Sequence, residues 1–154
     1  MKLRRKTFSV SDAKIFIPAI CDFVGYEVKC KGLHWSSPSK NIHLYLDELW
    51  EKLLDYIDSL AEGYMGVNGY FGPNDITATD FDYINAKEFI DGLCERLDRF
   101  HEDIPEGPQW TGIVSITEDF IQVAYQYRYL FAMSNQNGNF GTPISGKYGD
   151  LEEE

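Results

Sequence analysis

The residue pattern that points most directly to chemistry is one histidine and three carboxylates on a single predicted helix. They are His43, Asp47, Asp58 and Glu62. At about 100° of rotation per residue, all four fall within an arc of about 100° on the helix surface. Imidazole nitrogen with carboxylate oxygen suits Fe²⁺, Mn²⁺ or Zn²⁺, and carboxylates can bridge two ions. The pattern therefore predicts metal binding and metal redox chemistry.

This polar stripe does not point straight into the helix's own bundle, because it lies to one side of the apolar stripe of the same helix. Three apolar residues lie between the two stripes: Trp50, Leu54 and Ala61. They would form an exposed apolar strip beside the acids if the helix met only water. We expect a helix of another subunit to cover them.

The four polar residues are placed symmetrically along the helix, with Leu53 next to the midpoint. If an identical helix packed antiparallel about a two-fold axis, His43 and Asp47 of one chain would lie opposite Asp58 and Glu62 of the other. The symmetry would create two such sites per pair of chains. A solvated acidic face is the competing interpretation, because the same helix carries further acids on its other faces: Glu48, Glu51 and Asp55.

Four segments show the apolar periodicity of helices: residues 10–34, 41–65, 86–104 and 115–134. Asn85 with Glu88, and Ser115 with Glu118, have the capping-box spacing expected at helix starts. Pro18 either starts or kinks the first helix.

The expected core of the first two helices consists of their repeating apolar residues. These are Ile17, Ile20, Phe23, Val24, Val28 and Leu33, then Ile42, Leu46, Leu49, Leu53, Ile57, Leu60 and Tyr64. Gly63 and Gly66 are expected to end the second helix. The link from 66 to 85 is long for a helix–helix turn and suggests a crossover connection. With no convincing strand pairing, the sequence predicts an all-α four-helix bundle.

Length and composition fit one domain of this kind. The chain has 154 residues and a net charge of −11, and no apolar run approaches the ~20 residues that span a membrane. We expect a basic arm at 1–9, the bundle at 10–134 and a Gly-rich, acidic, extended or mobile tail at 135–154.

The net charge bears on which partners the protein can bind, and the cysteine content bears on its cellular compartment. The charge argues against a surface devoted to nucleic acid. A basic cluster could still touch DNA or an acidic partner, or simply be solvated: Lys2, Arg4, Arg5 and Lys6. Three widely spaced cysteines fit reduced, buried thiols, so we expect a cytoplasmic protein.

Residues 31–66 resemble the signature region of the Dps-type miniferritins, within the ferritin-like superfamily. Members carry an HW pair at the end of the first helix, then H-x₃-D and D-x₃-E on the second. The matching residues here are His34–Trp35, His43 and Asp47, and Asp58 and Glu62.

The resemblance implies a ferritin-like bundle, a twelve-subunit shell and iron oxidation by hydrogen peroxide or oxygen, with storage of Fe(III). It also implies a ferroxidase site shared by two subunits. His34, His43 and Asp47 would come from one subunit, Asp58 and Glu62 from its mate, and Trp35 would lie just behind the ligands.

A non-enzymatic alternative stays open. The segment between His34 and His43 is shorter than in typical members, Ser36 replaces an Asn, and Gly63 replaces an Arg. The shortened segment and the unusual tail favour a ferritin-like structural or interaction protein with a degenerate site, for instance a component of a larger particle. His101, beside Glu102 and Asp103, fits a surface helix terminus better than a ligand, and no E-x-x-H motif of an intrasubunit di-iron site occurs.

Overall fold

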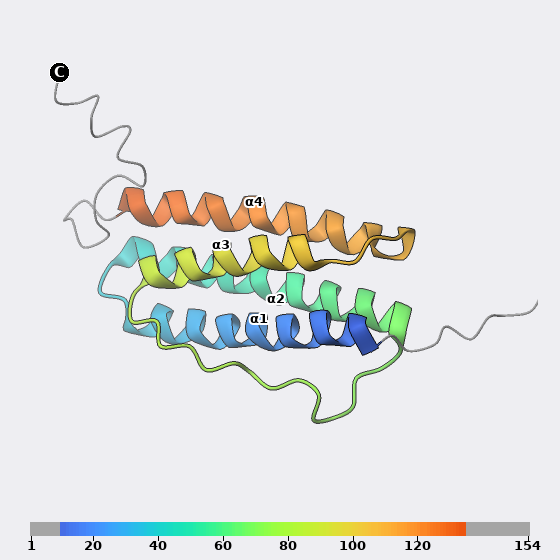
Figure 1. The fold of residues 1–154 in the computed structure, drawn as a ribbon. Helices are drawn as coiled ribbons and strands as arrows, with labels where there is room; N and C mark the ends of the chain where they lie inside the picture. The colour runs from blue at the N-terminus through green and yellow to red at the C-terminus, as the bar shows by residue number, and fades with distance from the viewer. Residues whose placement is uncertain (1–9, 135–154) are drawn as a thin grey trace, which may run out of the picture.

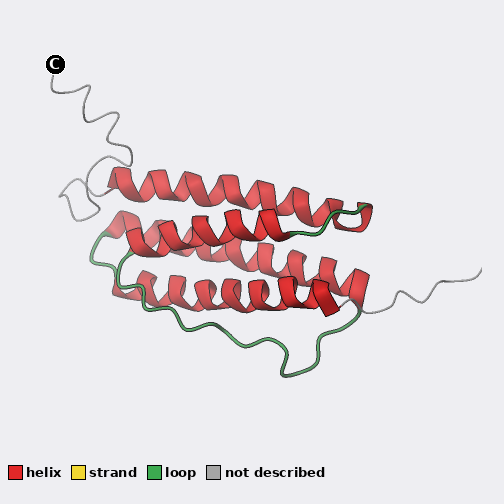
Figure 2. Ribbon diagram, in the orientation of Figure 1, coloured by secondary structure: helices red, strands yellow, loops and turns green. Residues whose placement is uncertain are grey.

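The computed structural model describes residues 10–134, which form four long helices and one short 3₁₀ turn (Figure 1). The elements are α1 (Val10–Ser36), α2 (Lys40–Asn68), α3 (Ala86–Asp103), η1 (Pro108–Trp110) and α4 (Thr111–Ser134). Figure 2 shows helices joined by loops, and no strand occurs within residues 10–134. The all-α prediction is confirmed. The basic cluster at Lys2–Lys6 and the tail at 135–154 lie outside the described residues.

The helices run in an order that requires a crossover. α1 and α2 are antiparallel neighbours, and the connection after α2 then returns along the whole bundle before α3 begins (Figure 1). As a result α2 and α3 point the same way, and α4 runs antiparallel to both. α1 packs mainly on α2 and α3, and α4 packs on the same two helices.

The crossover connection is fastened to α1 by hydrogen bonds. The Thr79 backbone N–H donates to the Cys21 carbonyl at 3.1 Å, and the Thr79 hydroxyl donates to an Asp22 oxygen at 2.6 Å. Arg96 of α3 donates to the other Asp22 oxygen at 2.7 Å. Gly25 permits this close approach, since a Cβ there would collide with the Thr79 carbonyl oxygen.

Aromatic packing holds the second half of the same connection. Tyr26 stacks on Phe81 with ring centroids 4.2 Å apart, and its hydroxyl lies 2.9 Å from that of Tyr83. The Tyr83 hydroxyl in turn occupies the space where a Cβ of Gly92 would lie. Thr79, Phe81 and Tyr83 thus fasten this part of the connection to α1 and α3.

Two helices, α2 and α3, begin after a residue whose side chain caps the first turn. Ser39 caps α2 by accepting from the Ile42 N–H. Asn85 caps α3 as predicted, accepting from the Glu88 N–H at 2.9 Å. The Glu88 carboxylate accepts from the Ile84 N–H at 3.2 Å. These contacts satisfy backbone donors that the first turn of a helix leaves unpaired.

α1 contains Pro18 in its interior, so of the two predicted roles for this residue the start of the helix is excluded. The predicted end of the second helix was wrong. α2 does not end at Gly63 or Gly66 but continues to Asn68, where Gly69 adopts φ 88°.

The start of α4 was also predicted wrongly. It begins at Thr111, so Ser115 lies inside the helix and is not its cap. The reason is Trp110, which is fully buried and stacks on Phe16 with ring centroids 4.6 Å apart. This anchor fixes the chain immediately before α4.

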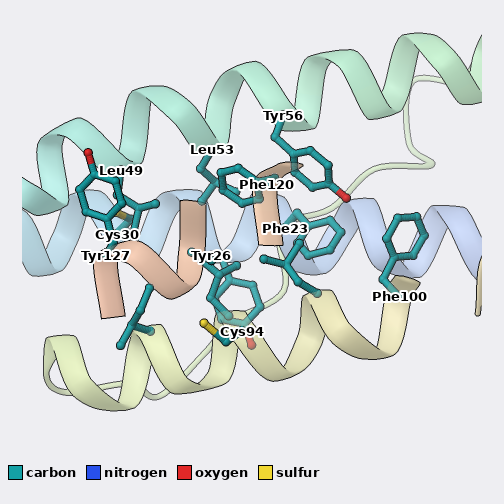
Figure 3. Close-up of a cluster of buried hydrophobic side chains, with 14 of the residues drawn as sticks. Phe23, Tyr26, Cys30, Leu49, Leu53, Tyr56, Cys94, Phe100, Phe120 and Tyr127 are labelled. Atoms are coloured by element: carbon teal, nitrogen blue, oxygen red, sulfur yellow. The ribbon is translucent and has the colours of Figure 1, made fainter. Parts of the chain in front are cut away.

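The core is a continuous apolar cluster contributed by all four helices (Figure 3). Four of the core residues predicted for the first two helices are not buried: Val28 is 57% exposed, and Ile17, Val24 and Ile57 are only half-buried. Tyr56 is buried instead of Ile57, since its ring stacks on Phe120 with centroids 4.6 Å apart and its hydroxyl lies 3.0 Å from that of Thr117 of α4.

The prediction of buried thiols holds for two of the three cysteines. Cys30 and Cys94 are buried, Cys21 is half-buried, and all three are free. Burial raises the pKa of the Cys94 thiol to about 12, so it stays protonated at neutral pH. None of the helices in residues 10–134 is long and apolar enough to cross a membrane.

Candidate metal site

Two predicted ligands meet where α1 ends and α2 begins. The rings of His34 and His43 stack with centroids 3.8 Å apart and planes inclined by 20°. Each ring bonds to the other residue's backbone: His34 Nδ1 lies 2.6 Å from the His43 carbonyl oxygen, and His43 Nδ1 lies 2.7 Å from the His34 carbonyl oxygen. The two residues form a crossed pair that joins the helices.

This pairing fixes the protonation pattern of both rings. A carbonyl oxygen only accepts hydrogen bonds, so each Nδ1 must carry the proton. In the neutral rings each Nε2 then keeps its lone pair. Histidine ligands in metal sites commonly show the same arrangement, with the second ring N–H held by a backbone carbonyl. His43 also satisfies one of the carbonyls that the last turn of α1 leaves unpaired.

Asp47 is the third predicted ligand in this cluster. Its Oδ1 lies 3.9 Å from Nε2 of His34 and 2.9 Å from Nζ of Lys31. The hydrogen bond and positive charge of Lys31 hold the pKa of Asp47 below its ordinary value. Asp47 is therefore a carboxylate at any pH near neutrality.

The distance between the ligand atoms of His34 and Asp47 is short enough for both residues to bind one metal ion. Two ligand atoms that each lie roughly 2.1 Å from one ion can be at most about 4.2 Å apart. The 3.9 Å between Nε2 and Oδ1 is within that limit.

Lys31, Trp50 and Glu27 extend this cluster, and the sequence analysis assigned no role to Lys31 or Glu27. The Lys31 ammonium lies 4.0 Å from the centroid of the Trp50 ring, whose Nε1–H donates to Glu27 at 2.6 Å. The signal for them was available, since Glu27, Lys31 and His34 recur at the i, i+4, i+7 spacing of one helix face.

The remaining two predicted ligands lie apart from this cluster. Asp58 and Glu62 are exposed and form no hydrogen bond or ion pair with any part of residues 10–134. Asp58 follows Asp47 by three turns, roughly 16 Å along the helix. Within the described chain, no group of three or more histidine, cysteine or acidic side chains has a geometry that could hold a metal ion. A site that combines all five residues therefore requires a second chain.

The surroundings of the stripe are partly as predicted. Trp50, Leu54 and Ala61 are half-buried in the single chain, while Trp35 is 73% exposed. His101 lies near the end of α3, as predicted for a surface helix terminus, and its Nε2 is 3.0 Å from a Glu118 oxygen of α4.

Fold and site together define an all-helical four-helix bundle with a histidine–carboxylate cluster at one end. Residues 34–131 match DUF5856, a family of unknown function, and the chain belongs to that family. The matched range includes all five predicted ligands. No curated protein and no solved structure matches the chain.

Proposed function

We propose that the protein is a Dps-like, ferritin-like iron-binding protein that oxidises Fe(II) with hydrogen peroxide or oxygen at a site between two subunits and stores the Fe(III). The observation that carries the proposal is the crossed pair of His34 and His43 beside the Asp47 carboxylate. It brings two imidazole rings and one carboxylate to one end of the bundle, donor types that suit Fe²⁺, with Zn²⁺ or Mn²⁺ as substitutes, and the partner subunit would complete the set.

The second half of the proposed site comes from a partner subunit. In an antiparallel α2 pair related by a two-fold axis, Asp58 and Glu62 of one chain face Asp47 and His43 of the other. Both acids are exposed and have no partner in residues 10–134, so they are available for this contact. The half-buried apolar strip beside them would be covered in the same interface.

The order of the helices supports the ferritin-like part of the proposal. Ferritin-like bundles have one long crossover connection, which makes the second and third helices parallel. The connection between α2 and α3 has this course (Figure 1).

Carboxylates suit iron oxidation because they bind both oxidation states and can bridge two ions. In the proposed reaction two Fe²⁺ ions give one electron each to hydrogen peroxide, which takes up two protons and leaves as two water molecules. Asp47, Asp58 and Glu62 would balance the charge that the iron gains.

The test compares two double variants of α2. Asp58→Ala with Glu62→Ala removes the acids of the proposed site, and Glu51→Ala with Asp55→Ala removes two other exposed acids of the same helix. Fe²⁺ is added without oxygen, peroxide follows, and Fe(III) formation is recorded optically. We expect the first variant to lose rapid oxidation and the second to retain it. Equal rates in both variants would refute the proposed site.

A second candidate function follows from the ion pair between Lys31 and Asp47. If that ammonium is a permanent replacement for a metal, the protein is a ferritin-like structural or interaction protein with a degenerate site. It would then take up no divalent cation, which distinguishes it from the first proposal.

A further inference from the structure

Lys31 holds the same carboxylate oxygen that faces His34. Oδ1 of Asp47 lies 2.9 Å from the Lys31 ammonium and 3.9 Å from Nε2 of His34. A divalent cation bound by His34 and Asp47 would therefore lie within a few ångströms of a positive charge belonging to the protein itself. The two cations would compete for one oxygen.

The ammonium also has a second binding place beside the site. It lies over the face of Trp50, and the Trp50 ring is held in turn by its hydrogen bond to Glu27. A cation over an aromatic face is attracted by the ring's negative face. Lys31 can thus give up Asp47 to a metal and remain at the site, held over the Trp50 ring.

We propose that Lys31 is an internal competitor that sets how tightly the site binds divalent cations. In the metal-free protein its ammonium neutralises Asp47, and when a cation binds, the ammonium must yield that oxygen and is repelled by the new charge. This inference rests on the proposed function, because it concerns the affinity of that same site. Removing the charge of Lys31 should make divalent cation binding about tenfold tighter, a modest effect because both side chains are partly solvated.

Three substitutions in the full-length protein test this role. Lys31→Met removes the charge, Lys31→Arg keeps it, and Lys29→Met removes a neighbouring half-buried lysine that has no ion pair in residues 10–134. Co²⁺ serves as a probe that peroxide-free buffer does not oxidise, and calorimetry gives its dissociation constant. Circular dichroism establishes that each variant is folded, and Lys31→Gln replaces Lys31→Met if the latter is not.

The result expected is tighter Co²⁺ binding in Lys31→Met, with Lys31→Arg and Lys29→Met close to the unsubstituted protein. If the unsubstituted protein binds Co²⁺ and Lys31→Met binds it equally, Lys31 is only a structural ion pair. The inference is then overturned while the proposed function stands. If neither protein binds Co²⁺, both fail. If only Lys31→Met binds it, the competition is established and the native protein is the degenerate form.

Discussion

Gly25 provides a sharp test of how the crossover connection is held, because its missing side chain makes room for Thr79. In Gly25→Ala the new Cβ collides with the Thr79 carbonyl oxygen. That backbone cannot move away without breaking the contacts that Thr79 makes with Cys21 and Asp22. The substitution should therefore push the connection off α1.

The cost follows from the contacts affected. Overpacking costs about 1–3 kcal/mol. Two weakened hydrogen bonds, one of them to a carboxylate, add about 1–2 kcal/mol. Alanine in a helix returns about 1 kcal/mol relative to glycine. We expect a net loss of about 1–4 kcal/mol in the free energy of unfolding, which lowers Tm by roughly 2–16 °C for a chain of this size.

Gly32 of the same helix is the matched control. A Cβ at Gly32 would have nothing within 4 Å, so Gly32→Ala should stabilise the protein by up to about 1 kcal/mol. Thermal and urea unfolding, both recorded by circular dichroism, measure the two changes. A Gly25→Ala protein as stable as Gly32→Ala would refute the close packing of Thr79 on α1.

Three further predictions concern the helix caps, the buried charges and the tyrosines. Asn85→Ala removes the side chain that caps α3 and should cost about 1 kcal/mol in urea unfolding, and an unchanged midpoint would contradict the observed cap. Asp22→Ala leaves Arg96 without its carboxylate and should cost about 1–3 kcal/mol, while the double variant with Arg96→Met should recover part of that loss, so full additivity would argue against the ion pair. Burial raises the pKa of Tyr56 above its ordinary value, so the unfolded chain ionises first as pH rises, and the stability that Tyr56 contributes below pH about 10 is lost above it. Tm measured from pH 8 to 11 should fall less steeply in Tyr56→Phe, and parallel curves would contradict this assignment.

Local sequence signals predicted the helices well because most of them act within a few residues. The apolar periodicity of α2 and the cap at Asn85 are examples. The start of α4 was missed because it depends on Trp110 stacking on Phe16, which is distant in the sequence. Ser115 had the right spacing for a cap, but a buried anchor upstream outweighs one capping hydrogen bond.

The candidate site was predictable only where its residues belong to one helix. The spacing of His43 and Asp47 places both on one side of α2, which a helical wheel can show. The crossed pairing with His34, and the contact of Lys31 with Asp47, depend on how α1 and α2 pack across the turn between them. No periodicity within one helix contains that information.

Native mass spectrometry of the full-length protein, before and after anaerobic addition of Fe²⁺, tests the central claim most directly because it counts subunits and ions together. The account predicts an oligomer built from two-fold pairs, up to twelve subunits, that gains about two ions per site. Uptake should be lost in His43→Ala with Asp47→Ala. A monomer that takes up no iron would contradict the account.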